Sequence, residues 1–184
     1  MGYYINIDES NVVLTEENQS QILQRWKDLN SPSNNHLKRG GSWSEGKQVA
    51  TWYSWLDQNY DKTVEDCAEM LEMLGFDFET QDNGDIHVTG YDRKTGQEDL
   101  FFKAISDLIP AGQYIHWRGE DGETYSWVFA QNKMLEVDTK EAMKIARKLL
   151  TEAVVKTTEV KQPVITNNET KESEPKKKNG RYVL

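Results

Sequence analysis

The chain has 184 residues, of which 31 are acidic and 22 basic, so its formal net charge at neutral pH is −9. This length allows one domain with an extension, and the negative charge disfavours nucleic-acid binding over the whole surface. The single cysteine, Cys67, excludes an intrachain disulfide. Apolar runs are shorter than the ~20 residues that span a membrane, and the first residues do not resemble a signal peptide. We therefore expect a soluble, cytoplasmic protein.

Strand and helix patterns follow one another from the first residues onward. We expect a strand at residues 3–7 and then a helix that Thr15 caps and that ends before Pro32. Residues 31–47 are rich in Ser, Asn, Gly and basic side chains, which predicts a long loop. A short strand is expected to follow at 52–55.

The segment 63–90 predicts a helix followed by a β-hairpin. Thr63 and Asp66 have the spacing of a capping box, and Gly75 stands where a helix C-cap belongs. The next two apolar runs flank Asn83-Gly84, a pair that favours a type I′ turn.

A second helix and hairpin are expected at 97–130. Thr95 and Glu98 repeat the capping-box spacing, and Pro110 ends the helical pattern. The remaining expected elements are hairpin strands at 114–118 and 124–130, a strand at 134–137, and a final helix from about 138 to 155.

This order of elements predicts an α+β fold with a mainly antiparallel sheet and helices packed on one face. The charge changes sign near Val137, because residues 1–137 carry a net charge of −13 and the rest of the chain +4. We therefore expect three regions: an acidic α+β domain at 1–137, a C-terminal helix at 138–156, and a disordered lysine-rich tail at 157–184.

Patterns of catalytic and metal-binding residues are missing from the sequence. Cys67 lies on the apolar face of a predicted helix, where a thiol packs as a small hydrophobe. His36, His87 and His116 stand apart without the spacing of a zinc site, and the glycines match no phosphate-binding loop. We expect a protein that is not an enzyme, with no catalytic residue, metal or cofactor.

The most informative feature is a run of acidic side chains within ordered structure. Between Asp57 and Asp99 there are 13 acidic residues and three basic ones, a net charge of −10. Acidic residues on a helix are often only its solvated face, but here the imbalance continues through the following hairpin. A fixed negative surface attracts a basic partner. The expected partner contacts are Asp66, Glu69, Glu72, Asp82, Asp85, Glu120 and Asp121, with Arg118 orienting the second hairpin.

Several short motifs resemble a family of small acidic proteins of phages and mobile elements. These motifs are Gly2-Tyr3-Tyr4, Trp52-Tyr53-Ser54-Trp55, Thr63-Val64-Glu65-Asp66, Leu74-Gly75-Phe76, Gly90-Tyr91-Asp92, Gly96-Gln97-Glu98-Asp99-Leu100-Phe101, and the run from Tyr114 through Trp117-Arg118-Gly119-Glu120-Asp121-Gly122. The resemblance carries over no catalytic residues. It implies an accessory protein of a mobile element and, by analogy, an anti-CRISPR that blocks a Cas9-type nuclease.

The leading hypothesis is a non-enzymatic protein that binds and inhibits a basic, nucleic-acid-handling host protein, without direct nucleic-acid contact through the acidic domain and without membrane contact. One alternative is a small-ligand binder or small enzyme with an aromatic pocket near Trp52, Trp55, Trp117 and Trp127. Another is a structural or assembly protein of the same mobile element. The lysine-rich tail is expected either to aid solubility or to contact an acidic partner.

Overall fold

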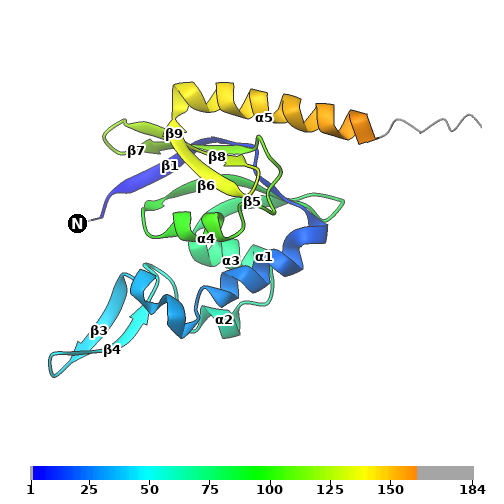
Figure 1. The fold of residues 1–184 in the computed structure, drawn as a ribbon. Coiled ribbons are helices and arrows are strands. Elements are labelled where there is room, and N and C mark those ends of the chain that lie inside the picture. Colours follow the sequence, from blue (N-terminus) through cyan, green and yellow to red (C-terminus); the bar gives the residue numbers. More distant parts are fainter. Residues whose placement is uncertain (1, 161–184) are drawn as a thin grey trace, which may run out of the picture.

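The computed structural model describes residues 2–160, and it confirms an α+β fold (Figure 1). The main sheet has seven strands and every pairing in it is antiparallel. Its order is β5-β6-β1-β7-β8-β9, and β2 pairs with the start of β6. The strands are β1 (Tyr4–Ser10), β2 (Val13–Leu14), β5 (Phe76–Thr80), β6 (Ile86–Lys94), β7 (Tyr114–Gly119), β8 (Thr124–Ala130) and β9 (Lys133–Asp138).

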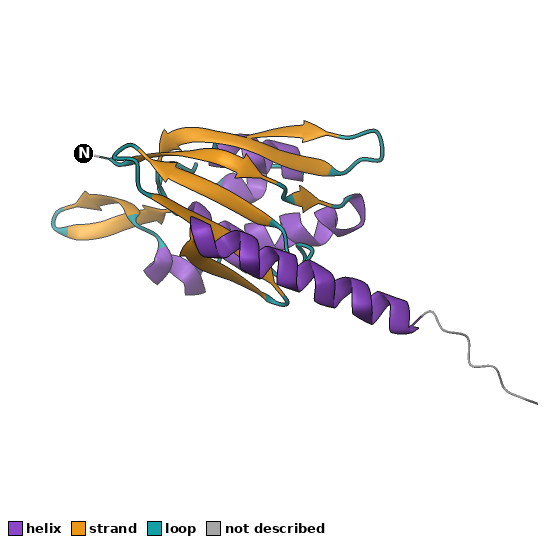
Figure 2. Cartoon of the chain, turned by 90° about the horizontal axis from the view of Figure 1, so that it is seen from above, coloured by secondary structure: helices purple, strands orange, loops and turns teal. Residues whose placement is uncertain are grey.

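Helices cover both faces of this sheet, as Figures 1 and 2 show. The first four pack together on one face, and α5 lies across the other face over β8. They are α1 (Glu16–Asp28), α2 (Tyr60–Thr63), α3 (Cys67–Leu74), α4 (Glu98–Ala104) and α5 (Thr139–Val160). No helix within residues 2–160 is both long and apolar enough to cross a membrane.

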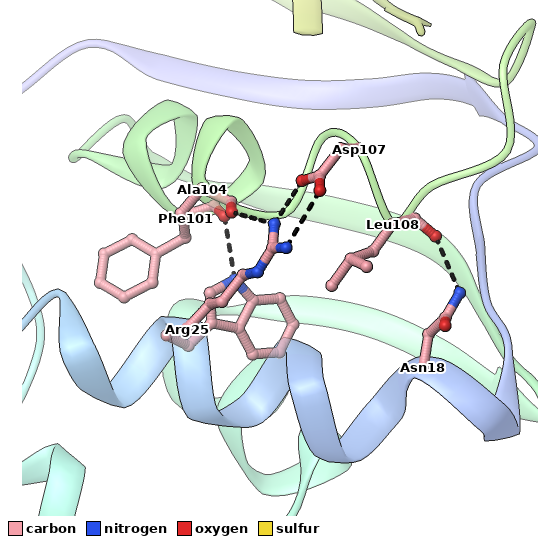
Figure 3. A network of polar contacts seen from close by, with 7 residues as sticks. Asn18, Arg25, Phe101, Ala104, Asp107 and Leu108 are labelled. Atoms are coloured by element: carbon pink, nitrogen blue, oxygen red, sulfur yellow. Dashed lines mark hydrogen bonds and ion pairs between the residues drawn. The ribbon is translucent and has the colours of Figure 1, made fainter. Parts of the chain in front are cut away.

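The main core is aromatic and joins α1 to α4. Trp26 is fully buried, and its Nε1 donates a hydrogen bond of 2.9 Å to the carbonyl oxygen of Phe101. The ring of Phe101 meets those of Tyr53 and Tyr60 edge to face, which suits the quadrupoles of aromatic rings. Figure 3 shows the polar part of this junction, where the Arg25 guanidinium pairs with Asp107.

A smaller core lies between the sheet and α5. Ala142 and Ala146 are buried against Tyr114 and Val128, and their small side chains let the helix approach the strands closely. Val137, where we placed the end of the acidic domain, lies within β9. The final helix is longer than expected because it continues to Val160. The rest of the predicted disordered tail, 161–184, lies outside the described residues.

The predicted loop at 31–47 is wrong. It contains a 3₁₀ helix, η1 (Pro32–Leu37), and most of a separate two-stranded hairpin, β3 (Gly40–Ser44) and β4 (Lys47–Trp52), here called the arm. The arm projects from the body of the molecule (Figure 1). Glycine is a weak strand former, but at Gly40 it leaves space for the Trp52 ring. A Cβ on Gly40 would lie 2.4 Å from that ring. The predicted strand at 52–55 is also wrong, because only Trp52 belongs to a strand.

Of the three predicted helix caps, Thr15 has the N-cap position but not the side-chain hydrogen bond, and Thr63 and Thr95 do not have the cap position. Thr15 precedes α1 but makes no side-chain cap, and the Asp85 carboxylate accepts from Glu16 N–H at 2.8 Å instead. Thr63 ends α2. The residue that caps α3 is Asp66, which accepts from Glu69 N–H at 2.9 Å. Likewise, α4 begins at Glu98 with Gln97 in the cap position, so Thr95 plays no part.

The two predicted hairpins, β5–β6 and β7–β8, are confirmed, and so is the C-cap at Gly75, whose φ is +94°. The type I′ turn is wrong. That turn needs positive φ at both central residues, but Gly84 alone has positive φ, +85°. Asn83 instead accepts from Asp85 N–H through its side chain at 3.2 Å, which makes an Asx turn.

Candidate functional site

The first group of expected contact residues gathers where α1, α3 and the β5–β6 turn meet. The Cys67 thiol donates to the carbonyl oxygen of Gln19, so the start of α3 lies against α1. The Asp85–Glu16 bond brings the β5–β6 turn to the same place. We call this region the acidic end; its side chains are Glu16, Glu17, Glu65, Asp66, Glu69, Asp82 and Asp85. The expected contact Glu72 lies farther along α3, beside Met73.

Some carboxylates of the acidic end hold the fold together. Asp66 caps α3 through Glu69 N–H, and Glu69 accepts from Glu65 N–H just before the helix at 2.7 Å, so the two side chains satisfy amides around the start of α3. Asp85 does the same for α1. These three residues are therefore structural as well as negatively charged.

Other carboxylates of the acidic end are free to meet a partner. Glu65 and Asp82 are exposed, and neither side chain forms a hydrogen bond or an ion pair within the described structure. Indeed, none of the ion pairs among the described side chains, which are those of residues 2–152, involves the acidic end. The negative charge there is therefore not neutralised by neighbouring cations of the described chain.

The second group of expected contacts lies on the β7–β8 turn. Arg118 forms an ion pair with Asp8, 2.5 Å between Nη2 and Oδ2. Asp121 accepts hydrogen bonds from the Tyr3 hydroxyl and from Glu123 N–H, and the first of these lowers the pKa of its carboxyl group. Glu120 is exposed and carries no such bond in the described structure.

The structure does not bring the two groups together. Ile86 starts β6 beside the β5–β6 turn, whereas Arg93, near the strand's other end, lies across β1 from Gly119 of the β7–β8 turn. At ~3.3 Å per residue, this length of strand separates the turns by roughly 20 Å. Figure 1 shows the turns at opposite ends of the sheet. A partner that binds one group therefore need not touch the other.

The thiol and the histidines do not form a reactive cluster. Cys67 is buried, and burial is the main reason that its thiol pKa rises to about 12, which keeps the thiol protonated at neutral pH. His116 is buried in β7 with Nδ1 2.6 Å from the Ser126 hydroxyl, while His87 lies on β6. Among residues 2–152, whose side chains the structure describes, no group of three or more His, Cys, Asp or Glu is arranged to hold a metal ion.

The aromatic residues expected to form one pocket are dispersed. Trp117 and Trp127 belong to the main core, where their ring centroids lie 4.7 Å apart. Trp52 packs on the arm over Gly40, and Trp55 is 63% exposed. The four indoles therefore do not share a pocket.

A groove that the sequence did not reveal surrounds Trp55. It has a volume of about 390 Å³ and lies beside the end of β6 and the C-terminal end of α3. We call it the Trp55 groove; it is lined by Tyr4, Trp55, Met73, Leu74, Tyr91, Asp92, Arg93 and Lys94. These residues come from four separate parts of the chain, so no local motif marks the groove.

A buried acid lies behind the Trp55 groove. The Glu98 carboxylate is 5% exposed and accepts hydrogen bonds from the Tyr91 hydroxyl and from Gly96 N–H. Burial raises the pKa of the Glu98 carboxyl group. A Cβ on Gly96 would lie 2.7 Å from the Trp55 ring and 3.0 Å from Glu98, so this glycine lets the acid approach the indole.

A second, more polar cleft of about 590 Å³ separates the arm from the body. Its walls carry side-chain amides together with Lys38, whose Nζ donates to the carbonyl oxygen of Asn30 and to Asn35 Oδ1. Partial burial lowers the pKa of Lys38. The amides belong to Asn30, Asn35, Gln48, Gln58 and Asn59.

No family model, curated protein or solved structure matches the chain. The functional argument therefore rests on the geometry and charge of the residues described above.

Proposed function

We propose that this protein is a non-enzymatic accessory protein of a phage or mobile element that binds and inhibits a basic, nucleic-acid-handling host protein. A Cas9-type nuclease is the expected target. Such nucleases hold their guide–target duplex in a positively charged channel. An acidic surface of fixed shape can occupy that kind of channel in place of nucleic acid.

One observation supports this proposal above the others. Carboxylates from α1, α3 and the β5–β6 turn converge at the acidic end, and within the described structure no cation pairs with them. Two of them are held in place, since Asp66 and Asp85 are hydrogen-bonded to helix starts. A rigid negative surface binds a basic partner with little loss of side-chain freedom.

The experiment begins with capture from nuclease-treated host lysate to name the target, which is then purified with and without its nucleic acid. Binding to the full chain is measured over a series of salt concentrations, together with inhibition of the target's activity. We expect binding to weaken steeply as the salt concentration increases, because salt screens the exposed charges. We also expect nucleic acid bound to the target to compete with this protein.

An unrelated basic protein of similar net charge is the control for nonspecific attraction. The proposal fails if the control binds as tightly as the target. It also fails if the target's affinity is the same at low and high salt, or if binding leaves its activity unchanged.

A further inference from the structure

Trp55 has an unusual backbone conformation. Its φ is +69°, in the left-handed region that bulky side chains rarely adopt. Hydrogen bonds on both sides fix the chain, because Gln97 Oε1 accepts from Ser54 N–H and Leu56 N–H donates to the carbonyl oxygen of Tyr53. The fold therefore keeps this residue in a disfavoured conformation, which is a recognised feature of binding sites.

The strained backbone presents the Trp55 indole to solvent in a fixed orientation. The side chain is 63% exposed, and its Nε1 donates to the carbonyl oxygen of Thr95 at 3.2 Å. One side of the ring rests against Gly96. An exposed indole with a fixed orientation loses little entropy when a ligand packs against it.

The neighbours of Trp55 combine apolar surface with positive charge. Met73 and Tyr4 line the same groove, and Tyr4 is itself 45% exposed. Lys94 Nζ lies 5.6 Å from the centre of the Tyr4 ring. Neither Lys94 nor Arg93 forms an ion pair within the described structure, so both remain available to an anionic group.

This composition fits a protein segment better than nucleic acid. Trp, Tyr, Arg and Met are the residues enriched in the energetic centres of protein interfaces. Nucleic-acid affinity needs many phosphate contacts, but the groove offers two cations and also contains Asp92. A chain of net charge −9 repels a polyanion, whereas a short segment with few carboxylates experiences much less repulsion.

We propose that the Trp55 groove is a docking site for an extended segment of another protein, which packs one apolar or aromatic side chain against Trp55 and Met73 and places carboxylates beside Arg93 and Lys94. The site lies at the end of β6 away from the acidic end. It is therefore a second interaction surface, independent of the proposed inhibitor function.

The test selects peptides from a random phage-displayed library on the full chain, with depletion on the Trp55→Ala variant. We expect the selected peptides to share an aromatic or aliphatic residue flanked by Asp or Glu. A synthetic peptide of the enriched sequence should bind at least about tenfold more weakly to Trp55→Ala and to the double variant Arg93→Glu/Lys94→Glu, as for an interface hot spot.

Matched controls separate this site from general stickiness. Trp43 is 68% exposed on the arm, and Lys133 is exposed at the start of β9. Trp43→Ala and Lys133→Glu should leave the affinity of the synthetic peptide within about twofold of the wild-type value. A Trp55→Gly variant removes the indole without backbone strain, because glycine adopts positive φ freely. Its far-UV circular dichroism should therefore match that of the wild type.

The proposal is overturned if no selected peptide depends on Trp55, or if the enriched peptides are basic. It is also overturned if a single-stranded oligonucleotide of mixed sequence binds the groove and displaces the peptide. Reversal of charge at Glu65 and Asp82 should not change peptide affinity, so failure of the proposed inhibitor function and failure of this site give different results.

Discussion

Replacing Trp55 is expected to weaken peptide binding while leaving the stability of the fold almost unchanged. A non-glycine residue in the left-handed region destabilises the fold by roughly 1–2 kcal/mol. The Trp55→Gly substitution relieves this backbone strain, but it also removes the limited packing of a mostly exposed side chain. We therefore expect the free energy of unfolding in urea to change by no more than about 1 kcal/mol. For comparison, Phe101→Ala in the core should lose about 3–5 kcal/mol. A large loss at Trp55→Gly would mean that the indole is a structural residue.

Glu98 makes the stability depend on pH. Burial raises the pKa of its carboxyl group in the folded state above the unfolded value of about 4.3. The native state then binds the proton of Glu98 more tightly than the unfolded state does. The resulting contribution to the free energy of unfolding is complete below the unfolded pKa and is lost as the pH rises through the folded pKa. Glu98→Gln retains an acceptor for Gly96 N–H but does not titrate.

Urea unfolding at several pH values measures this effect. Between about pH 4 and neutral pH, the free energy of unfolding should fall more for the wild type than for Glu98→Gln. Parallel curves for the two proteins would show that the Glu98 carboxyl group has the same pKa in both states.

At the scale of elements, substitutions of Asp85 and Asp82 should differ in their effect on the stability of the fold. Both lie in the β5–β6 turn, but only Asp85 accepts from the first amide of α1. Asp85→Ala should lower the free energy of unfolding by about 0.5–2 kcal/mol, the usual effect of losing a helix cap. Asp82→Ala should change it by less than about 0.5 kcal/mol. Thermal unfolding of the two variants measures the difference, and equal losses would contradict the long-range cap.

The elements that sequence alone predicts are those whose signals are local. The helix α3 ends at Gly75 and the hairpin β5–β6 turns at Gly84, and both glycines have the positive φ expected of them. The arm escaped prediction because β3 begins with Gly40-Gly41, which has no strand propensity of its own. Its pairing depends on Trp52, twelve positions away from Gly40, covering that glycine.

At the scale of the molecule, composition predicts how much negative charge there is but not how it is divided. Local patterns place Asp82 and Glu120 on hairpin turns. That these turns lie at opposite ends follows from β1, which pairs with β6 on one side and with β7 on the other. The Trp55 groove is hidden for the same reason, since Tyr4, Trp55, Met73 and Arg93 meet only after the sheet and helices assemble.

This division gives the last prediction, for the target named by capture. Two double variants change the net charge equally: Glu65→Lys/Asp82→Lys at the acidic end and Glu120→Lys/Glu123→Lys on the β7–β8 turn. The four side chains are exposed and form no ion pair in the described structure, so the fold should tolerate both changes. If the acidic end is the contact surface, the first variant should associate about tenfold more slowly at low salt than the second. Surface plasmon resonance measures both association rates. Because the two variants have the same net charge, equal slowing would show that the overall charge controls association. Slower association of the second variant would place the partner at the β7–β8 turn.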